Sequence, residues 1–464
     1  MRVLEILLLF LLALLLFRPL LPNRLHKLVP QWLLALTLVV FALHGWIERV
    51  RWQMVPAYVV LSGLVFTWLL QRVSVVRLVR NLGRITGSLA LVIATALSII
   101  FPVTNLPTPR GAYLVGTTSI TLRDEARDEI FTDDPTDKRE LMIQIWYPAT
   151  PPLSARPAPW MQRMDIVGPA IAQWIRLPSF LLDHTGLVRS NSYIDVPVSE
   201  AEAIYPVLIA SHGWGGFRNI SANQNEALAS HGYIVVSIDH PYAGLVTLFN
   251  DGRIILNKRS LLPERGETNF LSSAQTLVQV FSQDQRFVMD QLTKINTNDV
   301  RFAGRMDLAR IGLFGHSTGG GAVVNTCAID QRCKAGFGLD PWVEPVTDDI
   351  IQHGLSQPFM FMRSEEWTGP NTKNDPRLTQ LFEHMRGPHR RVSVRGSRHY
   401  DFTLIGLLSP LAPTLKLKGL INGPHMLRLT EDYLVAFFDE TLKGKLPDSG
   451  AQALKIEYPE AEEK

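Results

Sequence analysis

The chain has 464 residues, of which 46% are hydrophobic and 19% charged, and its formal net charge at pH 7 is +3. This apolar content is ample for a folded core, and the length accommodates one large α/β domain and a second region, so the composition excludes a disordered protein. Many basic residues among the first hundred lie between apolar runs, where lipid headgroups explain them better than nucleic acid does. Because no basic stripe occurs elsewhere, we expect no nucleic-acid partner.

Four apolar runs occupy the first hundred residues, at 3–17, 28–47, 54–70 and 85–103. Each is near the length that a membrane-spanning helix needs, although the first is short and carries Glu5. A cleaved signal peptide is an alternative for the first run, but it lacks a clear small-residue cleavage site and leaves the other three unexplained. The sequence therefore predicts a transmembrane anchor of about four helices over residues 1–104.

The loops between these runs predict the orientation of the anchor. The loop between the second and third runs has only Arg49 and Arg51 beside Glu48, whereas the other two are richer in basic residues: Arg18, Arg24 and Lys27 in one, and Arg72, Arg77, Arg80 and Arg84 in the other. The positive-inside rule places the richer loops in the cytoplasm. We therefore expect an integral protein of a bacterial inner or plasma membrane, with residues 105–464 in the periplasm or outside the cell.

Beyond a proline-rich linker at residues 102–109, the pattern changes to strands and then to alternating strands and helices. A hairpin is expected first, with strands at residues 116–122 and 139–148. Six short apolar strands follow, at residues 205–213, 233–241, 310–315, 334–340, 358–364 and 389–397. Helical patterns lie near residues 223–230, 272–294, 320–328, 375–385 and 430–443. This alternation predicts a mostly parallel sheet with helices on both faces over residues 105–464.

The segment after the strand at 310–315 reads Gly315-His316-Ser317-Thr318-Gly319. It matches a G-x-S-x-G strand-to-helix elbow, in which a serine is held at the tip in a strained backbone conformation. Side chains two residues before and after the serine would collide with the neighbouring strand and helix, and Gly315 and Gly319 remove that collision. An ordinary glycine-rich turn is the alternative, but the flanking strand and helix favour Ser317 as a nucleophile.

A serine nucleophile requires a histidine to take its proton and a carboxylate to orient that histidine. In elbow-bearing α/β hydrolases the order along the chain is serine, acid, histidine, and each group follows a strand. Asp340 ends the strand after the elbow, and His399 follows the last strand. Both have alternatives, since Asp340 is also suited to cap a turn and His425 also precedes the last helix. His316 we expect to pack under the nucleophile.

The oxyanion of a tetrahedral intermediate needs preorganised backbone N–H groups. In such an elbow one N–H belongs to the residue after the nucleophile, here Thr318, and another to a glycine-rich turn after an earlier strand. The turn at residues 212–216 offers Trp214 for the second donor. A flexible turn without this role is the alternative.

Five motifs in this order, SHGWGGFR, ASHGYIVVSIDHP, GHSTGGG, GLDPW and GSRHYDFT, resemble the platelet-activating-factor acetylhydrolase family of α/β hydrolases, the serine-dependent, calcium-independent phospholipase A2 type. The similarity covers roughly residues 110–445. Carried over to the matching positions, it implies Ser317 as nucleophile, Asp340 as acid and His399 as base, with Trp214 and Thr318 at the oxyanion hole. We expect no cofactor.

Two features depart from that family. Thr318 stands where its animal members carry a bulky aromatic residue, and the four apolar runs resemble uncharacterised bacterial membrane-anchored relatives rather than the animal pattern. The run Gly319-Gly320-Gly321 also resembles cutinase-like and polyester-hydrolysing enzymes. An acetyl-phospholipid is therefore a candidate substrate only.

Two apolar insertions, at residues 160–188 and 404–421, are longer than connecting loops need to be. They could line an acyl pocket, rest on the bilayer or pack in the core. Cys327 and Cys333 are expected to form a disulfide in an oxidising compartment, since a metal site would need more ligands than lie nearby.

Three classes of function fit these residues. The first is a membrane-anchored serine esterase acting on lipids or short-acyl esters. The second is a hydrolase of the same fold with another substrate, such as a cutinase-like polyester or an acyl-peptide. The third is a non-catalytic membrane receptor or scaffold, which has no need of the nucleophile, acid, base and two oxyanion donors together.

Overall fold

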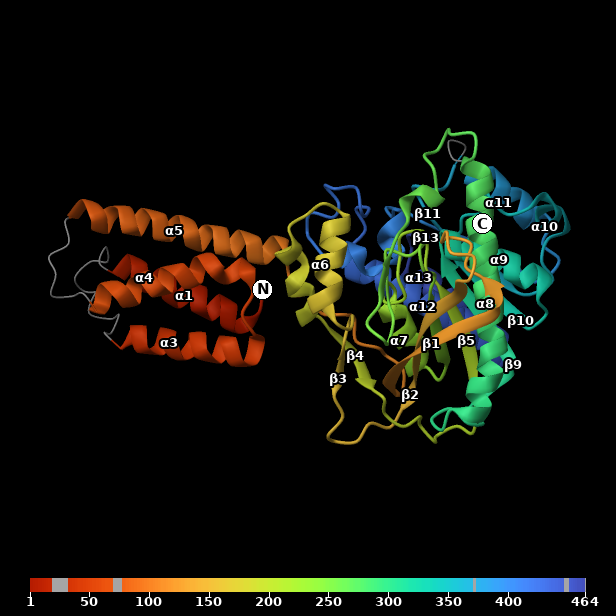
Figure 1. Ribbon diagram of the computed structural model, residues 1–464, viewed down its shortest axis with the longest axis horizontal. Helices are drawn as coiled ribbons and strands as arrows, with labels where there is room; N and C mark the ends of the chain where they lie inside the picture. Colours follow the sequence, from red (N-terminus) through yellow and green to blue (C-terminus); the bar gives the residue numbers. More distant parts are fainter. Residues whose placement is uncertain (19–31, 70–76, 370–372, 446–449, 464) are drawn as a thin grey trace.

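The computed structural model describes residues 1–18, 32–69, 77–369, 373–445 and 450–463. A bundle of helices and an α/β region lie end to end (Figure 1). Residues 28–31 of the second apolar run, and Arg24, Lys27 and Arg72 of the loops used to orient the anchor, lie outside the described residues.

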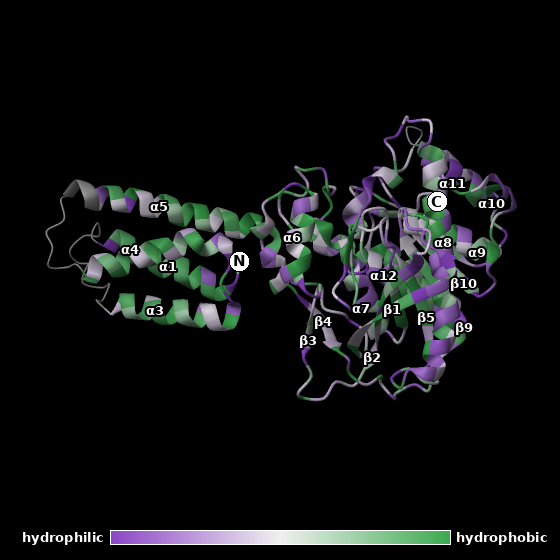
Figure 2. Ribbon diagram, in the orientation of Figure 1, coloured by the Kyte–Doolittle hydropathy of each residue, from purple (hydrophilic) through white to green (hydrophobic). Residues whose placement is uncertain are grey.

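The bundle is formed by the apolar runs. Its elements are α1 (Val3–Phe17), α3 (Leu33–Leu43) with η2 (His44–Glu48), η3 (Trp52–Met54) with α4 (Val55–Leu69), and α5 (Arg77–Ile100). Two stretches, Trp52–Leu69 with 18 residues and Asn81–Ile100 with 20, are long and apolar enough to cross a membrane, and the helices Val3–Phe17 and Leu33–Glu48 are shorter. In Figure 2 the helices of the bundle are drawn largely in green, the colour of hydrophobic residues. By length and apolarity alone, buried core helices and signal sequences would meet the same criterion.

Glu5, the acidic residue within the first apolar run, is buried and paired at one end of the bundle. Arg51 donates to both of its oxygens, from Nε at 2.6 Å and from Nη2 at 2.7 Å. Arg51 also donates to the carbonyl oxygen of Phe101 at 2.6 Å, just after α5 ends. The ion pair of Glu5 with Arg51 therefore links α1 to the loop before α4, and Arg51 links both to the residue after α5.

The α/β region is built on a sheet in the order β13-β12-β11-β10-β9-β5-β6-β2-β1-β4-β3. Its central strands, from β6 through β5, β9, β10 and β11 to β12, run parallel, whereas β2, β1 and β13 pair antiparallel at the two sides. The strands are β1 (Leu114–Asp128), β2 (Lys138–Ala149), β3 (Pro157–Pro159), β4 (Arg189–Ile194), β5 (Tyr205–Ser211), β6 (Ile234–Asp239), β9 (Met306–His316), β10 (Cys333–Leu339), β11 (Phe359–Ser364), β12 (His389–Val394) and β13 (Ala461–Glu463). The predicted mostly parallel sheet is confirmed.

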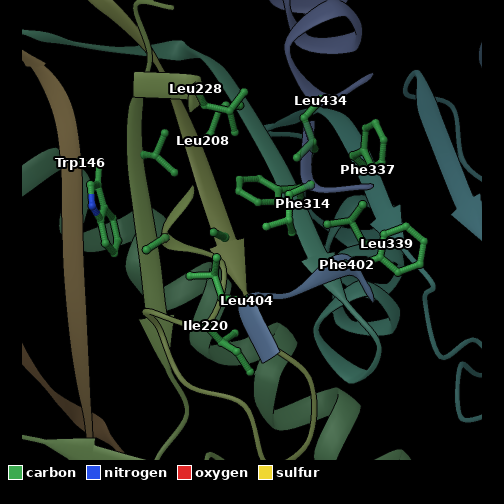
Figure 3. Packing of buried hydrophobic residues seen from close by; sticks show 14 of the residues in the cluster. Trp146, Leu208, Ile220, Leu228, Phe314, Phe337, Leu339, Phe402, Leu404 and Leu434 are labelled. Carbon is green, nitrogen blue, oxygen red and sulfur yellow. The ribbon is translucent and has the colours of Figure 1, made fainter. Parts of the chain in front are cut away.

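Helices cover both faces of this sheet. Side chains alternate along a strand, so in β9 Phe314 packs into one core cluster and Leu313 into the other. The first cluster lies under α6 (Met164–Trp174), α7 (Ala222–Ser230) and α12 (Gly423–Lys443), and Figure 3 shows Phe314 and Phe337 packed beside Leu434 of α12. The second lies under α8 (Phe270–Asn298), α9 (Thr318–Ile329), α10 (Asp348–His353) and α11 (Asn374–Glu383).

Several short elements carried no sequence signal strong enough to predict them. They are η4 (Ser179–Leu187), the two-stranded sheet β7 (Val246–Leu248) and β8 (Ile254–Leu256), η5 (Arg259–Leu261), η6 (His399–Phe402), η7 (Leu404–Leu407) and α13 (Gly450–Glu457). Strands of three residues such as β3 and β13 are defined by their partners rather than by their own composition. The insertion at 160–188 folds into α6 and η4, and the one at 404–421 begins with η7 and continues in turns.

The bundle and the α/β region touch at these insertions. Trp52 of η3 packs edge to face against Phe180 of the first insertion, with ring centroids 5.3 Å apart. Beyond α5, Thr104 donates to the carbonyl oxygen of Leu407 in the second insertion at 2.9 Å, and Leu106 is buried in the first core cluster. The linker residues from about 103 onward therefore pack with the α/β region.

Candidate active site

Ser317 lies between the last residue of β9 and the first residue of α9, with φ of 54° and ψ of −119°. A positive φ is strained for a residue with a Cβ, so the surroundings must hold it there. A Cβ added to Gly315 would lie 2.5 Å from the carbonyl carbon of Gly319, and one added to Gly319 would lie 2.3 Å from the carbonyl oxygen of Ser211. These approaches explain why both positions are glycine.

Backbone hydrogen bonds fix the strained serine. Its N–H donates to the carbonyl oxygen of Leu339 in β10 at 3.0 Å, and its carbonyl oxygen accepts from the N–H groups of Gly321 at 3.0 Å and Trp342 at 2.8 Å. The helix after it begins at Thr318, whose N–H has no acceptor among the described residues. The nucleophile candidate therefore sits at a helix N-terminus, where unpaired N–H groups favour negative charge.

Asp340 and His399 are brought together across the carboxyl edge of the sheet. His399 Nδ1 lies 2.8 Å from Asp340 Oδ2, although 59 residues separate them in the chain. The carboxylate also accepts from Ser364, through Oγ at 2.6 Å and N at 3.1 Å, and from Arg363 Nε at 3.1 Å. Asp340 is itself strained, with φ of 45°.

Burial alone would raise the pKa of the Asp340 carboxyl. The hydrogen bond from His399, with its charge and that of Arg363, outweighs burial and lowers this pKa to about 2. The group is therefore ionised at neutral pH and can only accept, so Nδ1 of His399 carries the proton. Nε2 is then the nitrogen left to act as a base.

Ser317 and His399 line the same pocket, but among the described residues no hydrogen bond joins Ser317 Oγ to the His399 ring. Such contacts are often long in ligand-free enzymes and tighten when substrate binds. Trp367 stacks on the His399 ring, with centroids 3.9 Å apart and planes 10° from parallel. The imidazole is therefore held between the Trp367 ring and the Asp340 carboxylate.

Neither of the two alternative histidines, His316 and His425, is placed as His399 is, beside the Asp340 carboxylate. His316 is buried, and its Nε2 lies 2.8 Å from the carbonyl oxygen of His399, to which it can only donate. Burial, reinforced by the charge of His399, lowers the pKa of His316 to about 3, so it is neutral. His425 pairs with Glu460 at 2.5 Å at the start of α12 and does not line the pocket.

The turn after β5 lies against the elbow. Gly213 is so close that a Cβ there would stand 2.8 Å from the Cβ of Ser317. The N–H of Trp214 donates to Thr318 Oγ1 at 3.2 Å, so the two residues expected at the oxyanion hole are in contact. Both line the pocket beside Ser317.

A buried network that the sequence reasoning missed supports this turn. Ser211 Oγ, directly before the turn, lies 2.7 Å from His240 Nε2, and His240 Nδ1 lies 2.8 Å from Asp284 Oδ2. Arg139 donates to both oxygens of Asp284, at 2.7 and 3.2 Å. His240 stacks on Phe281 with ring centroids 3.7 Å apart.

Burial lowers the pKa of His240 to about 3 despite the opposing effect of Asp284. Burial alone would raise the pKa of the Asp284 carboxyl, but the charge of Arg139 and the hydrogen bond from His240 together keep this pKa well below its usual range. Neutral His240 therefore donates to Asp284 and accepts from Ser211. This second Ser-His-Asp arrangement is buried and does not line the pocket, so it positions the turn. One signal was available in the sequence, because His240 directly follows a strand.

The pocket has a volume of about 620 Å³ and mostly apolar walls. The first insertion contributes Trp174 and Ile175, and the second contributes Ile405 and Leu417. Further apolar wall residues are Ile220, Leu245, Leu262 and Phe270. Both insertions thus line the cavity that contains Ser317, which agrees with the alternative in which they form pocket walls.

The structure contains a disulfide between Cys327, near the end of α9, and Cys333, at the start of β10.

Among the described residues, the one group of three metal-ligating side chains whose atoms lie within 4.8 Å of one another is Glu5, His44 and Glu48. That group lies in the bundle, away from Ser317, and Arg51 and Arg2 already pair with its carboxylates.

The family model for platelet-activating factor acetylhydrolase, isoform II, matches residues 98–251 and 277–452. Platelet-activating factor acetylhydrolase of Cavia porcellus is 29% identical over 278 residues, which are 55% of this chain and 62% of the relative. The enzyme of that name from Bos taurus is 28% identical over 264 residues, 51% of this chain and 57% of the relative. A probable 1-alkyl-2-acetylglycerophosphocholine esterase of Arthroderma benhamiae is 28% identical over 274 residues, 55% of this chain and 65% of the relative.

The chain thus spans less than two thirds of the length of the curated relatives it matches. Among solved structures, a ferulic acid esterase from Streptomyces cinnamoneus superposes with a TM-score of 0.62 at 23% identity, covering 74% of this chain and 94% of the esterase. At that identity the likeness shows a shared fold.

Proposed function

The chain belongs to the platelet-activating factor acetylhydrolase isoform II family, and we propose that it is a membrane-anchored serine esterase that hydrolyses carboxylic esters of lipids. One observation carries the proposal: the 2.8 Å contact of His399 Nδ1 with Asp340 lies at the pocket in which Ser317 is held at its strained elbow. These three side chains are of the types, and stand in the chain order, that acyl transfer by a serine hydrolase of this fold requires.

In the proposed reaction Ser317 Oγ attacks the acyl carbonyl carbon while His399 Nε2 takes the hydroxyl proton. The carbonyl oxygen becomes an oxyanion that accepts from the N–H groups of Trp214 and Thr318. His399 then gives its proton to the leaving alkoxide, which departs as the alcohol and leaves an acyl-serine. A water molecule attacks that ester by the same route in reverse, releasing the carboxylic acid and restoring Ser317. Asp340 stays ionised throughout and orients His399.

The walls of the pocket favour a lipid as the source of the ester. They are mostly apolar, and the two insertions that supply part of them also carry exposed apolar side chains, with Phe180 47%, Leu415 61% and Leu420 93% exposed. The insertions contact the bundle through Trp52 and the linker through Thr104. We propose that these side chains rest on the bilayer and that the substrate enters from it.

For the anchor we propose four spans with both termini outside the cytoplasm, followed by the catalytic domain. We propose the boundary between the two at residues 104 and 105, where Thr104 and Leu106 of the linker contact the α/β region. A reporter active only outside the cytoplasm should work when fused after Lys464 and be silent when fused within residues 72–84. The reverse pattern would overturn this orientation.

The catalytic proposal is tested with a fluorophosphonate probe, which reacts with an activated serine. The wild-type chain should be labelled and Ser317→Ala should not. The control is Ser282→Ala, which should label normally because Ser282 is a buried serine on α8 that does not line the pocket. Equal labelling of wild type and Ser317→Ala would refute Ser317 as the nucleophile. An unlabelled wild-type chain would favour the receptor or scaffold class instead.

The substrate class is tested by comparing chromogenic esters of rising acyl length in solution with phospholipid esters in vesicles. A lipid esterase should be faster on the vesicles than on a dissolved ester of equal acyl length. Preference for dissolved or polymeric esters would move the chain to the second class, a hydrolase of the same fold with another substrate.

A further inference from the structure

Thr318 has a contact that its proposed role as a backbone donor does not require. Its side-chain Oγ1 accepts the N–H of Trp214 at 3.2 Å, and this N–H is one of the two proposed for the oxyanion. The Thr318 side chain is buried at the pocket beside Ser317. The hydroxyl therefore occupies the donor that a substrate oxygen would need.

The hydroxyl of a threonine offers one proton and two acceptor positions. Among the described residues, Thr318 Oγ1 accepts from Trp214 and donates to no acceptor. In a helix interior such a hydroxyl often donates to the carbonyl four residues earlier, but Thr318 is the first residue of α9 and makes no such bond. Its proton is thus uncommitted and lies where the acyl oxygen must bind.

An oxyanion bound to the Trp214 N–H would lie beside Thr318 Oγ1, because both oxygens approach the same nitrogen. Two oxygens placed side by side repel each other unless a proton lies between them. The hydroxyl hydrogen can rotate to that position without movement of any heavy atom. The Trp214 N–H is then shared by the two oxygens, and the Thr318 hydroxyl donates its proton to the oxyanion.

We propose that the Thr318 hydroxyl is a third donor of the oxyanion hole and that, before substrate binds, its oxygen takes the place of the substrate oxygen on the Trp214 N–H. The inference rests on the proposed esterase function. It follows from preorganisation, since a buried N–H is unfavourable without an acceptor and a donor already in position needs no rearrangement during reaction.

The test compares Thr318→Val, which keeps the shape and removes the hydroxyl, with Thr318→Ser, which keeps the hydroxyl. In the full chain, Thr318→Val should lower kcat/KM for p-nitrophenyl acetate by about 100-fold with KM within about threefold, because loss of one oxyanion donor acts on the transition state. Thr318→Ser should stay within about tenfold of wild type. Thr326→Val is the matched control, since it removes a buried hydroxyl of the same helix that bonds to Gln285, outside the pocket lining.

A second measurement separates a donor from a merely structural residue. A trifluoromethyl ketone forms an oxyanion adduct with the serine, whereas the matching alcohol binds without reacting. Thr318→Val should weaken the ketone by the same factor as kcat/KM and leave the alcohol unchanged.

Equal ketone affinity in wild type and Thr318→Val, a parallel loss of alcohol binding, or failure of Thr318→Ser to restore turnover would overturn the inference while the esterase function stands. A wild-type chain without ester turnover or ketone binding would overturn the proposed function and the inference together.

Discussion

Replacement of Asp340 by asparagine tests the proposed site most directly. The carboxylate is fully buried and accepts from His399, Arg363 and both donors of Ser364. An asparagine whose Oδ1 keeps the bonds from Arg363 Nε and from the Ser364 N–H places its NH₂ group where Oδ2 was, facing His399 and Ser364 Oγ. Nδ1 of His399 must then accept rather than donate, so the proton moves to Nε2, the nitrogen needed as the base.

The expected loss of turnover follows from that change of tautomer. An incorrect tautomer in a serine triad lowers kcat by about 10⁴-fold, which corresponds to about 5 kcal/mol of transition-state stabilisation. Stability should also change, because the pKa of Asp340 lies at about 2 in the folded protein instead of 3.8. That difference contributes about 2 kcal/mol of stability at neutral pH, present in full above pH 3.8 and lost as pH falls toward 2.

Hydrolysis of p-nitrophenyl acetate and urea unfolding at pH 7 measure the two effects separately. Asp439→Asn is the control, because Asp439 on α12 is also a carboxylate with a lowered pKa and partners of its own, Tyr233 and Lys443, outside the pocket lining. It should lose stability and keep its turnover. If folded Asp340→Asn retained turnover within tenfold of wild type, Asp340 would not be the residue that orients His399.

Three further outcomes are expected. Burial, against the hydrogen bond from Asn223, raises the pKa of Glu431 to about 8, so folded stability should fall as pH rises from about 4.5 to 8. Glu431→Gln should remove that pH dependence and gain up to about 4 kcal/mol at pH 8 in urea unfolding, and an unchanged pH profile would contradict it. Gly319→Ala places a methyl group 2.3 Å from the carbonyl oxygen of Ser211, the last residue of β5, so it should cost about 2 kcal/mol and abolish probe labelling; a normally labelled variant would show that the elbow can relax. Paired Leu415→Asp and Leu420→Asp changes should slow hydrolysis in vesicles severalfold without altering turnover of a dissolved ester, and equal vesicle rates would place these residues away from the bilayer.

The architecture of the sheet was accessible from the sequence because its information is local. Apolar segments of six to nine residues predicted the central strands, and the structure places strands at each of them. The elbow was also readable, since the strained φ of Ser317 forces glycine at fixed positions on either side. By contrast, β3, β4 and β13 take their conformation from strands far along the chain, so their own residues predicted nothing.

The sequence by itself determined which groups follow the strands: Ser317, Asp340 and His399 stand there because of chain order and backbone sterics, which act over a few residues. Only the tertiary structure decided what these groups touch. The contact of Trp214 with Thr318 Oγ1, the support of Ser211 by His240, and the pocket walls formed by both insertions join residues dozens of positions apart. Such contacts depend on how the strands are ordered in the sheet and how the connections pack over its edge, and no short segment encodes that arrangement.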